Sequence, residues 1–262
     1  MSEPAATPFE LRDLAAEVGS EINDFLLVEV RRGHAAETKS SASDFVTAVD
    51  RACETRIVEA ITATRPDDGF KGEEGTDAPG ISGVRWIIDP IDGTANFVFA
   101  HPGFSVSIAA EVDGVVVAGV VADPMNRHLF DAVLGAGARC NGETLQVRPA
   151  TDITRSLVAT GFGYQPDRRR RQAHALMTIL PEIADIRRMG SAATDLCGVA
   201  LGRVDAYYET GLNEWDLAAG ALIAAEAGAV VKMPAPDDLM VAAAPGIIDD
   251  LLALIGRSGL ID

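Results

Sequence analysis

The feature that most constrains this chain is an apolar strand that runs directly into two aspartates. Residues 84–88 are mostly apolar and predict a buried strand, which Asp89 and Asp92 follow at once. Because proline lacks an N–H group and cannot extend a hydrogen-bonded ladder, we expect the strand to end at Pro90. Both carboxylates would then lie in the connection at the carboxyl end of a buried strand.

The two aspartates limit what can occupy that strand end. An ordinary Asx-type turn is one interpretation, but two carboxylates aimed together repel each other unless a cation or a proton lies between them. Oxygen ligands suit a hard cation such as Mg²⁺, whereas zinc would recruit His or Cys, and the 4 histidines are scattered without ligand spacing. Gly93 permits a tight turn, and Thr94 adds a hydroxyl and an N–H group. The motif therefore predicts a divalent-metal site.

The charge of the chain disfavours a nucleic-acid partner. The sequence has 39 acidic and 22 basic residues among 262, a formal net charge of −17, which opposes a broad footprint on a phosphate backbone. Residues 168–171 are four consecutive arginines. A solvated helix face is the favoured interpretation of this run, and an acidic or nucleic-acid partner is the alternative. A protein partner is not excluded.

Cysteine usage and hydropathy predict the compartment. Cys53, Cys140 and Cys197 are far apart and odd in number, which predicts buried thiols in a reducing compartment. The N-terminus lacks the basic start and apolar stretch of a signal peptide. The most apolar window, residues 217–231, is interrupted by Glu226 and is too short to cross a bilayer. We expect a cytoplasmic protein without a membrane segment.

The periodicity of the first half predicts helices followed by strands. Amphipathic helices are expected over residues 9–30 and from residue 44 or 45 to 63, separated by a mobile surface loop at residues 34–43 that contains Lys39. After the central motif, alternation predicts a mainly β region with a hairpin turn at Asp113-Gly114. Its longer strands are expected over residues 104–112, 114–122 and 127–134, with a further short pair after Gly135.

The second half predicts an α/β layer. Alternation fades around residue 148, so we place a subdomain boundary there: residues 1–148 form an α+β subdomain and residues 149–262 an α/β subdomain. On the strand that contains Tyr207 and Tyr208, one ring is expected in the core and the other at the surface. In this half, strands are expected over residues 157–160, 185–188, 206–209, 230–231 and 239–242. Helices are expected over residues 168–180, after residue 191, through residue 225, and at the end up to about residue 255.

Three further acids follow the same format as the central pair, an acid at the end of an element beside a small residue. They are Asp50, Glu73 and Asp216, and each alone is a weak signal. Asp216 has a competing explanation, since an acid is favoured at a helix N-terminus. The P-loop motif Gly-x-x-x-x-Gly-Lys-Ser/Thr does not occur, and Gly135-x-Gly137 and Gly161-x-Gly163 lack the third glycine of a dinucleotide-binding loop.

Together these motifs resemble one family. The segments Asp89-Pro-Ile-Asp-Gly-Thr94, Gly72-Glu-Glu-Gly75 and Trp215-Asp-Leu-Ala-Ala-Gly220 are similar to the signatures of the inositol monophosphatase family of magnesium-dependent, lithium-sensitive sugar-phosphate phosphatases. The resemblance covers most of the chain. It implies an α/β (α+β) fold, a layered αβαβα sandwich of the sugar phosphatase type, and a homodimer.

The resemblance implies a set of metal ligands. Glu73, Asp89 and the backbone oxygen of Ile91 would bind one Mg²⁺ ion, and Asp89 would bridge to a second ion completed by Asp92 and Asp216. A third, weaker ion would use Glu73 and waters. The resemblance thus implies two to three Mg²⁺ ions per active site.

It also implies catalytic and substrate contacts. Asp50 and Thr94 would hold and polarise the attacking water, with the metal ligand Glu73 as a third catalytic residue, and the N–H groups of Gly93 and Thr94 would receive phosphate oxygens. The implied polyol contacts are Asp92, Glu209 and the Gly190-Ser191-Ala192 segment. Ala95 and Ala229 depart from the family pattern, which leaves the substrate open.

The expected activity is hydrolysis of myo-inositol 1-phosphate by metal-activated water. Histidinol phosphate, fructose 1,6-bisphosphate and nucleotide 3′-phosphates are alternative substrates within the same class. An alternative of a different class is a mainly non-catalytic partner in ribosomal RNA transcription complexes, the role of some bacterial relatives.

Overall fold

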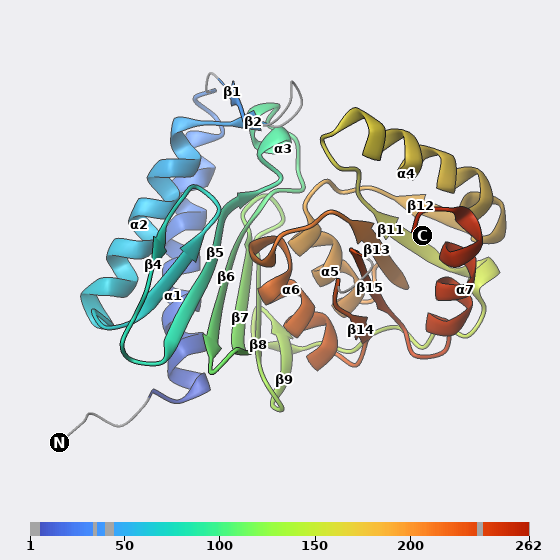
Figure 1. The fold of residues 1–262 in the computed structure, drawn as a ribbon. Coiled ribbons are helices and arrows are strands. Elements are labelled where there is room, and N and C mark those ends of the chain that lie inside the picture. The colour runs from blue at the N-terminus through green and yellow to red at the C-terminus, as the bar shows by residue number, and fades with distance from the viewer. Residues whose placement is uncertain (1–5, 34–35, 40–44, 235–237, 262) are drawn as a thin grey trace.

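The computed structural model describes residues 6–33, 36–39, 45–234 and 238–261. Within them, helices and two sheets alternate in five layers, which confirms the αβαβα sandwich (Figure 1). The helices are α1 (Pro8–Glu29), α2 (Ala48–Thr64), α3 (Thr94–Val98), α4 (Pro166–Ile179), α5 (Ala192–Ala200), α6 (Glu214–Glu226) and α7 (Ile248–Ser258), with 3-10 turns at Ile153–Arg155 and Leu180–Glu182.

The first sheet is mostly antiparallel and has the strand order β10-β9-β8-β7-β6-β5-β3-β4. Only the neighbours β3 and β5 run parallel. Helices α1 and α2 cover its outer face, and the buried apolar side chains of α1 pack on its central strands. The strands are β3 (Gly69–Gly72), β4 (Asp77–Ala78), β5 (Val84–Asp92), β6 (Ser105–Val112), β7 (Val115–Asp123), β8 (His128–Val133), β9 (Gly137–Cys140) and β10 (Glu143–Thr144).

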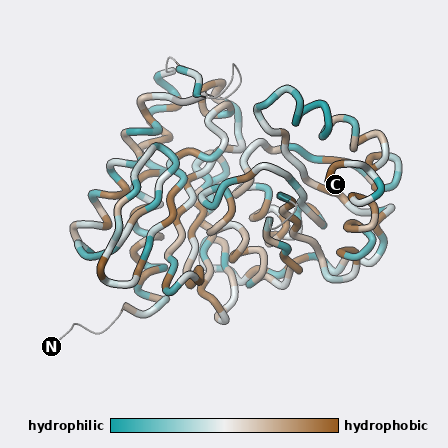
Figure 2. Tube along the Cα trace, in the orientation of Figure 1, coloured by the Kyte–Doolittle hydropathy of each residue, from teal (hydrophilic) through white to brown (hydrophobic). Residues whose placement is uncertain are grey.

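The second sheet has the strand order β12-β11-β13-β15-β14 and is covered on both faces. Helices α5 and α6 lie between the two sheets, and α4 and α7 cover the outer face (Figure 1). Figure 2 shows hydrophobic segments in the sheets and a mostly hydrophilic α4 at the outside. The strands are β11 (Leu157–Thr160), β12 (Asp185–Arg187), β13 (Ala206–Thr210), β14 (Val230–Lys232) and β15 (Leu239–Ala243).

The two sheets come from different halves of the chain. The strands of the first sheet lie within residues 69–144 and those of the second within residues 157–243. One buried cluster nevertheless joins both halves, since Ile87 and Val121 pack with Ala219 of α6. Division into subdomains 1–148 and 149–262 therefore stays a proposal about folding units.

The expectation that the central strand ends at Pro90 was wrong. In β5, Asp89 pairs with Ser107 and Asp92 with Ser105, with an irregularity between the two pairs. Three residue steps on β5 thus face two on β6, and this bulge accommodates the proline without an N–H group before the ladder resumes.

The start of α2 also differs from the prediction. The helix begins at Ala48, because Thr47 caps it and the preceding residues form strand β2 (Phe45–Val46), paired with β1 (Glu37–Thr38). The expected mobile loop at residues 34–43 lies partly outside the described residues, which lack 34–35 and 40–44.

Three other expectations can be compared directly with the structure. Asp113 and Gly114 form the β6–β7 turn with positive φ values of 51° and 79°, which confirms the hairpin turn. The expectation for Tyr207 and Tyr208 was wrong: both are buried, because helices cover both faces of their sheet. The three cysteines are buried free thiols, as predicted. No helix among the described residues has the length and hydropathy needed to span a bilayer.

Candidate metal centre

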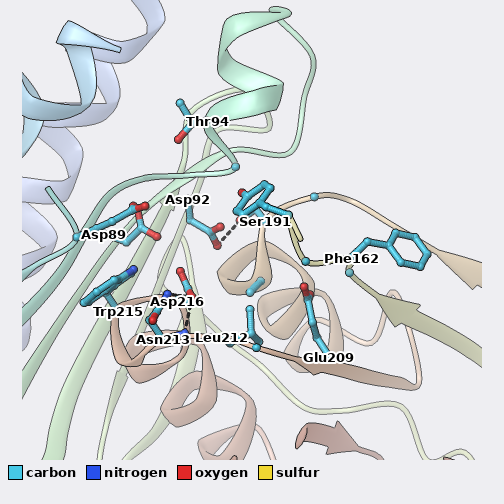
Figure 3. Close-up of a pocket in the computed structure, with 18 of the residues that line it drawn as sticks. Asp89, Asp92, Thr94, Phe162, Ser191, Glu209, Leu212, Asn213, Trp215 and Asp216 are labelled. Atoms are coloured by element: carbon cyan, nitrogen blue, oxygen red, sulfur yellow. Dashed lines mark hydrogen bonds between the residues drawn. The ribbon is translucent and has the colours of Figure 1, made fainter. Parts of the chain in front are cut away.

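Three aspartates meet where the two sheets face each other across α6. The bulge at the end of β5 presents Asp89 and Asp92, and Asp216 projects from the first turn of α6 (Figure 3). One carboxylate oxygen from each lies within 4.8 Å of the others. They line a cavity of about 460 Å³. Residues far apart in the sequence therefore build one acidic pocket.

In the part of the chain that the structure describes, this cluster has hydrogen-bond donors but no basic ion-pair partner. No lysine or arginine among the described residues forms an ion pair with Asp89, Asp92 or Asp216. Burial raises the pKa of Asp89 and Asp92 well above the ordinary aspartate value, and the neighbouring carboxylates raise it further. Burial likewise raises the pKa of Asp216 to about 6. An all-oxygen donor set of this charge fits a hard divalent cation.

Asp92 also joins the two halves of the chain. Its Oδ2 atom accepts hydrogen bonds of 2.7 Å from the Ser191 hydroxyl group and from the Ala193 N–H group at the start of α5. Both donors reach the same oxygen. These hydrogen bonds hold the Asp92 carboxylate, which also belongs to the three-aspartate cluster.

Asp216 serves both roles that the sequence left open. Its Oδ2 atom accepts a 2.7 Å hydrogen bond from the N–H group of Asn213, the N-cap residue of α6. The side chain therefore caps the helix and faces the other two aspartates at the same time.

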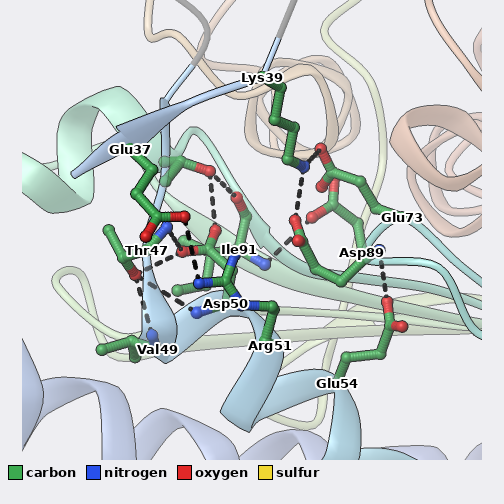
Figure 4. A network of polar contacts seen from close by, with 12 residues as sticks. Glu37, Lys39, Thr47, Val49, Asp50, Arg51, Glu54, Glu73, Asp89 and Ile91 are labelled. Atoms are coloured by element: carbon green, nitrogen blue, oxygen red, sulfur yellow. Dashed lines mark hydrogen bonds and ion pairs between the residues drawn. The ribbon is translucent and has the colours of Figure 1, made fainter.

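A second polar group lies behind the cavity wall. Asp50 is fully buried in the first turn of α2 and accepts hydrogen bonds from the Thr47 backbone and hydroxyl groups (Figure 4). The Thr94 hydroxyl lies 3.0 Å from Asp50 Oδ1 and 3.1 Å from the Ile91 carbonyl oxygen. Burial raises the pKa of Asp50 although these hydrogen bonds oppose the shift. Asp50 thus reaches the cavity only through Thr94.

Gly93 is required where β5 turns into α3. Its φ value is +89°, and a Cβ atom placed there would lie 2.7 Å from the carbonyl oxygen of Gly103 and 2.9 Å from that of Gly190. Only glycine fits this position without displacing backbone. The close approach brings Gly190 against the segment of residues 89–94, here called the metal motif.

Glu73 lines the same cavity but is outside the tight three-aspartate group. Lys39 Nζ lies 2.9 Å from Glu73 Oε1 and 2.5 Å from Glu74 Oε1. Burial alone would lower the pKa of Lys39, but the two carboxylates raise it above its ordinary value. Buried Glu54 accepts hydrogen bonds from the backbone N–H groups of Glu74 and Thr76, which fixes the loop that carries Glu73.

The predicted polyol contacts line the same cavity as the three aspartates, and Asp92 belongs to both sets. Gly190-Ser191-Ala192 and Glu209 line it, as do Gly93 and Thr94. Tyr207 donates a 2.8 Å hydrogen bond to Glu209 Oε2, and burial raises the pKa of Glu209 to about 7. Every predicted site residue except Asp50 therefore lines one cavity.

Sequence reasoning missed several lining residues. Exposure confirms the solvated face for residues 169–171, but Arg168 turns into the cavity. A signal was present in Gly161-x-Gly163, whose glycines leave space for this side chain and for Glu209. The other missed lining residues include Phe162, Tyr164, Arg188, Leu212 and Trp215.

Comparison with known proteins agrees with this architecture. The inositol monophosphatase family model matches residues 9–255. The inositol-1-monophosphatase SuhB of Mycobacterium tuberculosis is 42% identical over 283 aligned residues, covering 98% of this chain and 97% of the relative. The solved structure of Mycobacterium tuberculosis SuhB has a TM-score of 0.82 and 41% identity, covering 97% and 98% of the two chains. The Nus factor SuhB of Pasteurella multocida is 43% identical over 230 residues, covering 85% and 86%.

The family model thus spans the metal motif, the Glu73 loop and α6, which are the three segments that meet in the acidic pocket. Identity to the mycobacterial relative extends over nearly the whole of both chains. The chain belongs to the inositol monophosphatase family.

Proposed function

We propose that this phosphatase hydrolyses myo-inositol 1-phosphate to inositol and inorganic phosphate in a Mg²⁺-dependent reaction. The observation that carries the proposal is that three aspartates, buried or partly buried, meet in one cavity that Thr94 also lines, with Asp50 hydrogen-bonded to Thr94 behind the wall. Family membership supports the phosphatase class, and the chemistry of the pocket supports the metal.

The metal ligands would be Glu73, Asp89, Asp92, Asp216 and the Ile91 carbonyl oxygen. Together they would bind two to three Mg²⁺ ions, through oxygen atoms alone. When bound, Mg²⁺ supplies positive charge to the phosphoryl oxygens and lowers the pKa of water. The protein fixes the ligands beforehand: Asp92 by Ser191 and Ala193, and Asp216 by its helix cap.

Asp50 and Thr94 would position the attacking water and take its proton. The Thr94 hydroxyl donates toward Asp50 Oδ1, so its oxygen is free to accept a hydrogen from a water in the cavity. As the water attacks phosphorus, Thr94 would accept that proton and pass its own to Asp50 Oδ1. The raised pKa of Asp50 makes it a better base for this step.

Substrate orientation would come from the rest of the lining. The N–H groups of Gly93 and Thr94 would receive phosphate oxygens, and Glu209 and Asp92 would accept hydrogen bonds from ring hydroxyls. The Gly190-Ser191-Ala192 segment would pack beside the ring. Histidinol phosphate, fructose 1,6-bisphosphate and nucleotide 3′-phosphates stay competing substrates, and a homodimer is the proposed assembly.

A substrate panel tests the proposal. Phosphate release is measured for each ester with Mg²⁺ and with excess chelator, using the wild-type chain, Asp89→Asn, and Asp249→Asn as an exposed control. We expect the highest kcat/KM for inositol 1-phosphate and loss of turnover in chelator and in Asp89→Asn. Undiminished turnover in chelator would refute the mechanism, whereas a higher kcat/KM for another ester would replace the substrate alone.

A second role is proposed because relatives carry the name Nus factor SuhB at 43% identity. The chain would then also bind a protein partner in a transcription complex. Affinity capture with the purified chain and with Asp89→Asn separates the two roles. Retention of transcription factors by both proteins would support the second role, and their absence from both would remove it.

A further inference from the structure

Three hydroxyl groups meet beside Asp92, and the proposed mechanism uses only one of them. Ser105 begins β6 and is the ladder partner of Asp92 on β5, so the two side chains lie on the same face of the sheet. Ser191 directly precedes α5, and Thr194 lies in the first turn of that helix. Ser105 and Ser191 are buried and Thr194 is partly buried. Because a buried hydroxyl costs free energy unless it is hydrogen-bonded, the partners of these groups indicate what they do.

Ser191 joins the group to the carboxylate (Figure 3). Its Oγ atom lies 2.7 Å from Asp92 Oδ2, 2.9 Å from Thr194 Oγ1 and 3.1 Å from Ser105 Oγ. Thr194 Oγ1 in turn lies 3.3 Å from Ser105 Oγ. The three hydroxyl oxygens therefore form a closed triangle, and one of its corners is hydrogen-bonded to Asp92.

The direction of these hydrogen bonds follows from counting hydrogens. Each hydroxyl has one hydrogen, and an ionised carboxylate only accepts, so the Ser191 hydrogen is committed to Asp92. The contact between Ser191 and Thr194 must then be made by the Thr194 hydrogen, and the Ser105 hydrogen is left for the oxygen of Ser191 or of Thr194. Both routes end at Asp92. A hydroxyl that accepts hydrogen bonds becomes a stronger donor, so both groups strengthen the bond from Ser191 to Asp92.

An ordinary helix cap explains only part of this arrangement. Ser191 is the N-cap residue of α5, and its Oγ atom accepts a 3.1 Å hydrogen bond from the Thr194 N–H group. That cap needs the Ser191 oxygen but no hydroxyl at position 105 or 194. Ala109 and Ala110 are buried on the same strand as Ser105, so β6 accommodates small apolar residues in its interior. The hydroxyls of Ser105 and Thr194 therefore call for a role besides the cap.

We propose that Ser105 and Thr194 are positioning residues for Asp92 that act through Ser191. They fix the direction of the Ser191 hydroxyl and strengthen its hydrogen bond to Asp92 Oδ2, which keeps the carboxylate turned toward the three-aspartate cluster. The cation affinity of the pocket thus depends on two hydroxyls that do not touch the cation. This inference rests on the proposed function, because it takes the cation at Asp92 to be Mg²⁺.

Calorimetric titration of Mg²⁺ into the full-length chain, without substrate, measures the effect. Thr194→Val keeps the shape of the side chain and removes its hydroxyl, and Ser105→Ala removes the other. We expect each change to raise the apparent Kd for Mg²⁺ about fivefold, the effect of one lost neutral hydrogen bond. Thr194→Ser, which keeps the hydroxyl, should have the wild-type Kd. A Kd as high in Thr194→Ser as in Thr194→Val would assign the effect to packing and overturn the proposal.

Ser156→Ala is the matched control for the loss of a buried serine hydroxyl. Ser156 is buried and donates a 2.8 Å hydrogen bond to the Asp152 carbonyl oxygen, and it does not line the cavity. It should keep the wild-type Kd for Mg²⁺. A Kd raised in Ser156→Ala as much as in Ser105→Ala would mean that any such loss weakens the site, and would overturn the proposal.

A double-mutant cycle separates positioning from a general structural effect. If Thr194 acts through Ser191, Thr194→Val should leave the Kd for Mg²⁺ unchanged when it is added to Ser191→Ala. The same should hold for Ser105→Ala in that background. An increase of about fivefold in both backgrounds would show that the hydroxyls act independently of Ser191, and the proposal would fail.

Phosphate release by the same proteins separates this inference from the proposed function. If the wild-type chain hydrolyses no ester but the Kd values for Mg²⁺ follow the expected pattern, the proposed function fails and the positioning role stands. If hydrolysis is found and the wild-type chain, Ser105→Ala and Thr194→Val bind Mg²⁺ equally, the positioning role fails alone.

Discussion

Asp89→Asn tests the idea that repulsion among the three aspartates lowers the stability of the fold when no metal is bound. The substitution removes one charge while keeping the size of the side chain and an oxygen that can accept from the Ile91 N–H group, 3.0 Å from Asp89 Oδ1. Asp89 is buried, so its charge is little screened by solvent. We therefore expect the variant to be more stable than the wild-type chain without metal, and inactive with it.

The size of the effect follows from the geometry. Two unit charges at the 4.8 Å limit of the cluster repel by about 3.5 kcal/mol at an effective dielectric constant of about 20. The wild-type chain can avoid this repulsion by protonating one aspartate, which costs about 4 kcal/mol at pH 7 for an aspartate of ordinary pKa. That cost is the upper limit of the stabilisation that removing one charge can give. Removing Asp89 should thus stabilise the metal-free chain by roughly 2–4 kcal/mol, or by roughly 5–15 °C in Tm.

The pH dependence has a definite sign. The folded-state pKa values of Asp89, Asp92 and Asp216 are raised, so the folded chain binds protons more tightly than the unfolded chain. In chelator, wild-type stability should therefore rise as the pH falls from 8 through about 6, the pKa of Asp216. The advantage of Asp89→Asn should shrink over the same interval.

Thermal and urea unfolding in excess chelator, and again with Mg²⁺, measure these differences. Asp249→Asn, an exposed change of the same charge, should alter the free energy of unfolding by less than about 1 kcal/mol. Mg²⁺ should raise the Tm of the wild-type chain and not that of Asp89→Asn. Equal Tm values for the two proteins in chelator, or an equal Mg²⁺-induced rise, would refute the electrostatic account.

Three further predictions concern residues around the cluster. In the wild-type chain, the KM for inositol 1-phosphate should fall as the pH rises through about 7, because only the carboxylate form of Glu209 accepts from two hydroxyls. Glu209→Gln should remove this pH dependence, and a fall in KM that persists in the variant would contradict this role. Gly93→Ala should lower the free energy of unfolding by about 2 kcal/mol or more and remove turnover, as measured by urea unfolding and phosphate release; normal values would exclude the backbone clash. Glu54→Gln should raise the Mg²⁺ concentration that gives half-maximal kcat about tenfold, because the loop that carries Glu73 is no longer held. An unchanged Mg²⁺ titration curve would show that the loop keeps its position without Glu54.

Most elements could be predicted because their signals are local. The apolar steps of α1 and the Asp113-Gly114 turn depend on neighbours within a few residues, and both were found where periodicity placed them. Pro90 misled the prediction because a bulge let the strand continue past it. The burial of Tyr208 depends on α4 and α7, which approach its sheet from elsewhere in the chain, so no pattern within β13 could reveal it.

The site was less accessible to local reasoning. The metal motif could be found from the abrupt end of an apolar run, but spacing alone could not bring Glu73 and Asp216 to it; the family resemblance supplied that step. Arg168 was assigned to a solvated face because a run of four arginines is usually solvated, but only the three residues that follow it are exposed. Its true position depends on the space left by Gly211, which lies on a distant segment.

Each of the three aspartates both forms hydrogen bonds that hold its side chain in place and faces the acidic cluster. Asp89 Oδ1 accepts from Ile91, Asp92 Oδ2 from Ser191 and Ala193, and Asp216 Oδ2 from Asn213. One oxygen of each thus anchors the side chain to backbone or to a neighbouring element. Because the anchors are hydrogen-bond donors, they also favour the charged form of each carboxylate. The repulsion that destabilises the metal-free chain is therefore confined to oxygens already in place, and a cation entering the pocket would meet ligands that need little rearrangement.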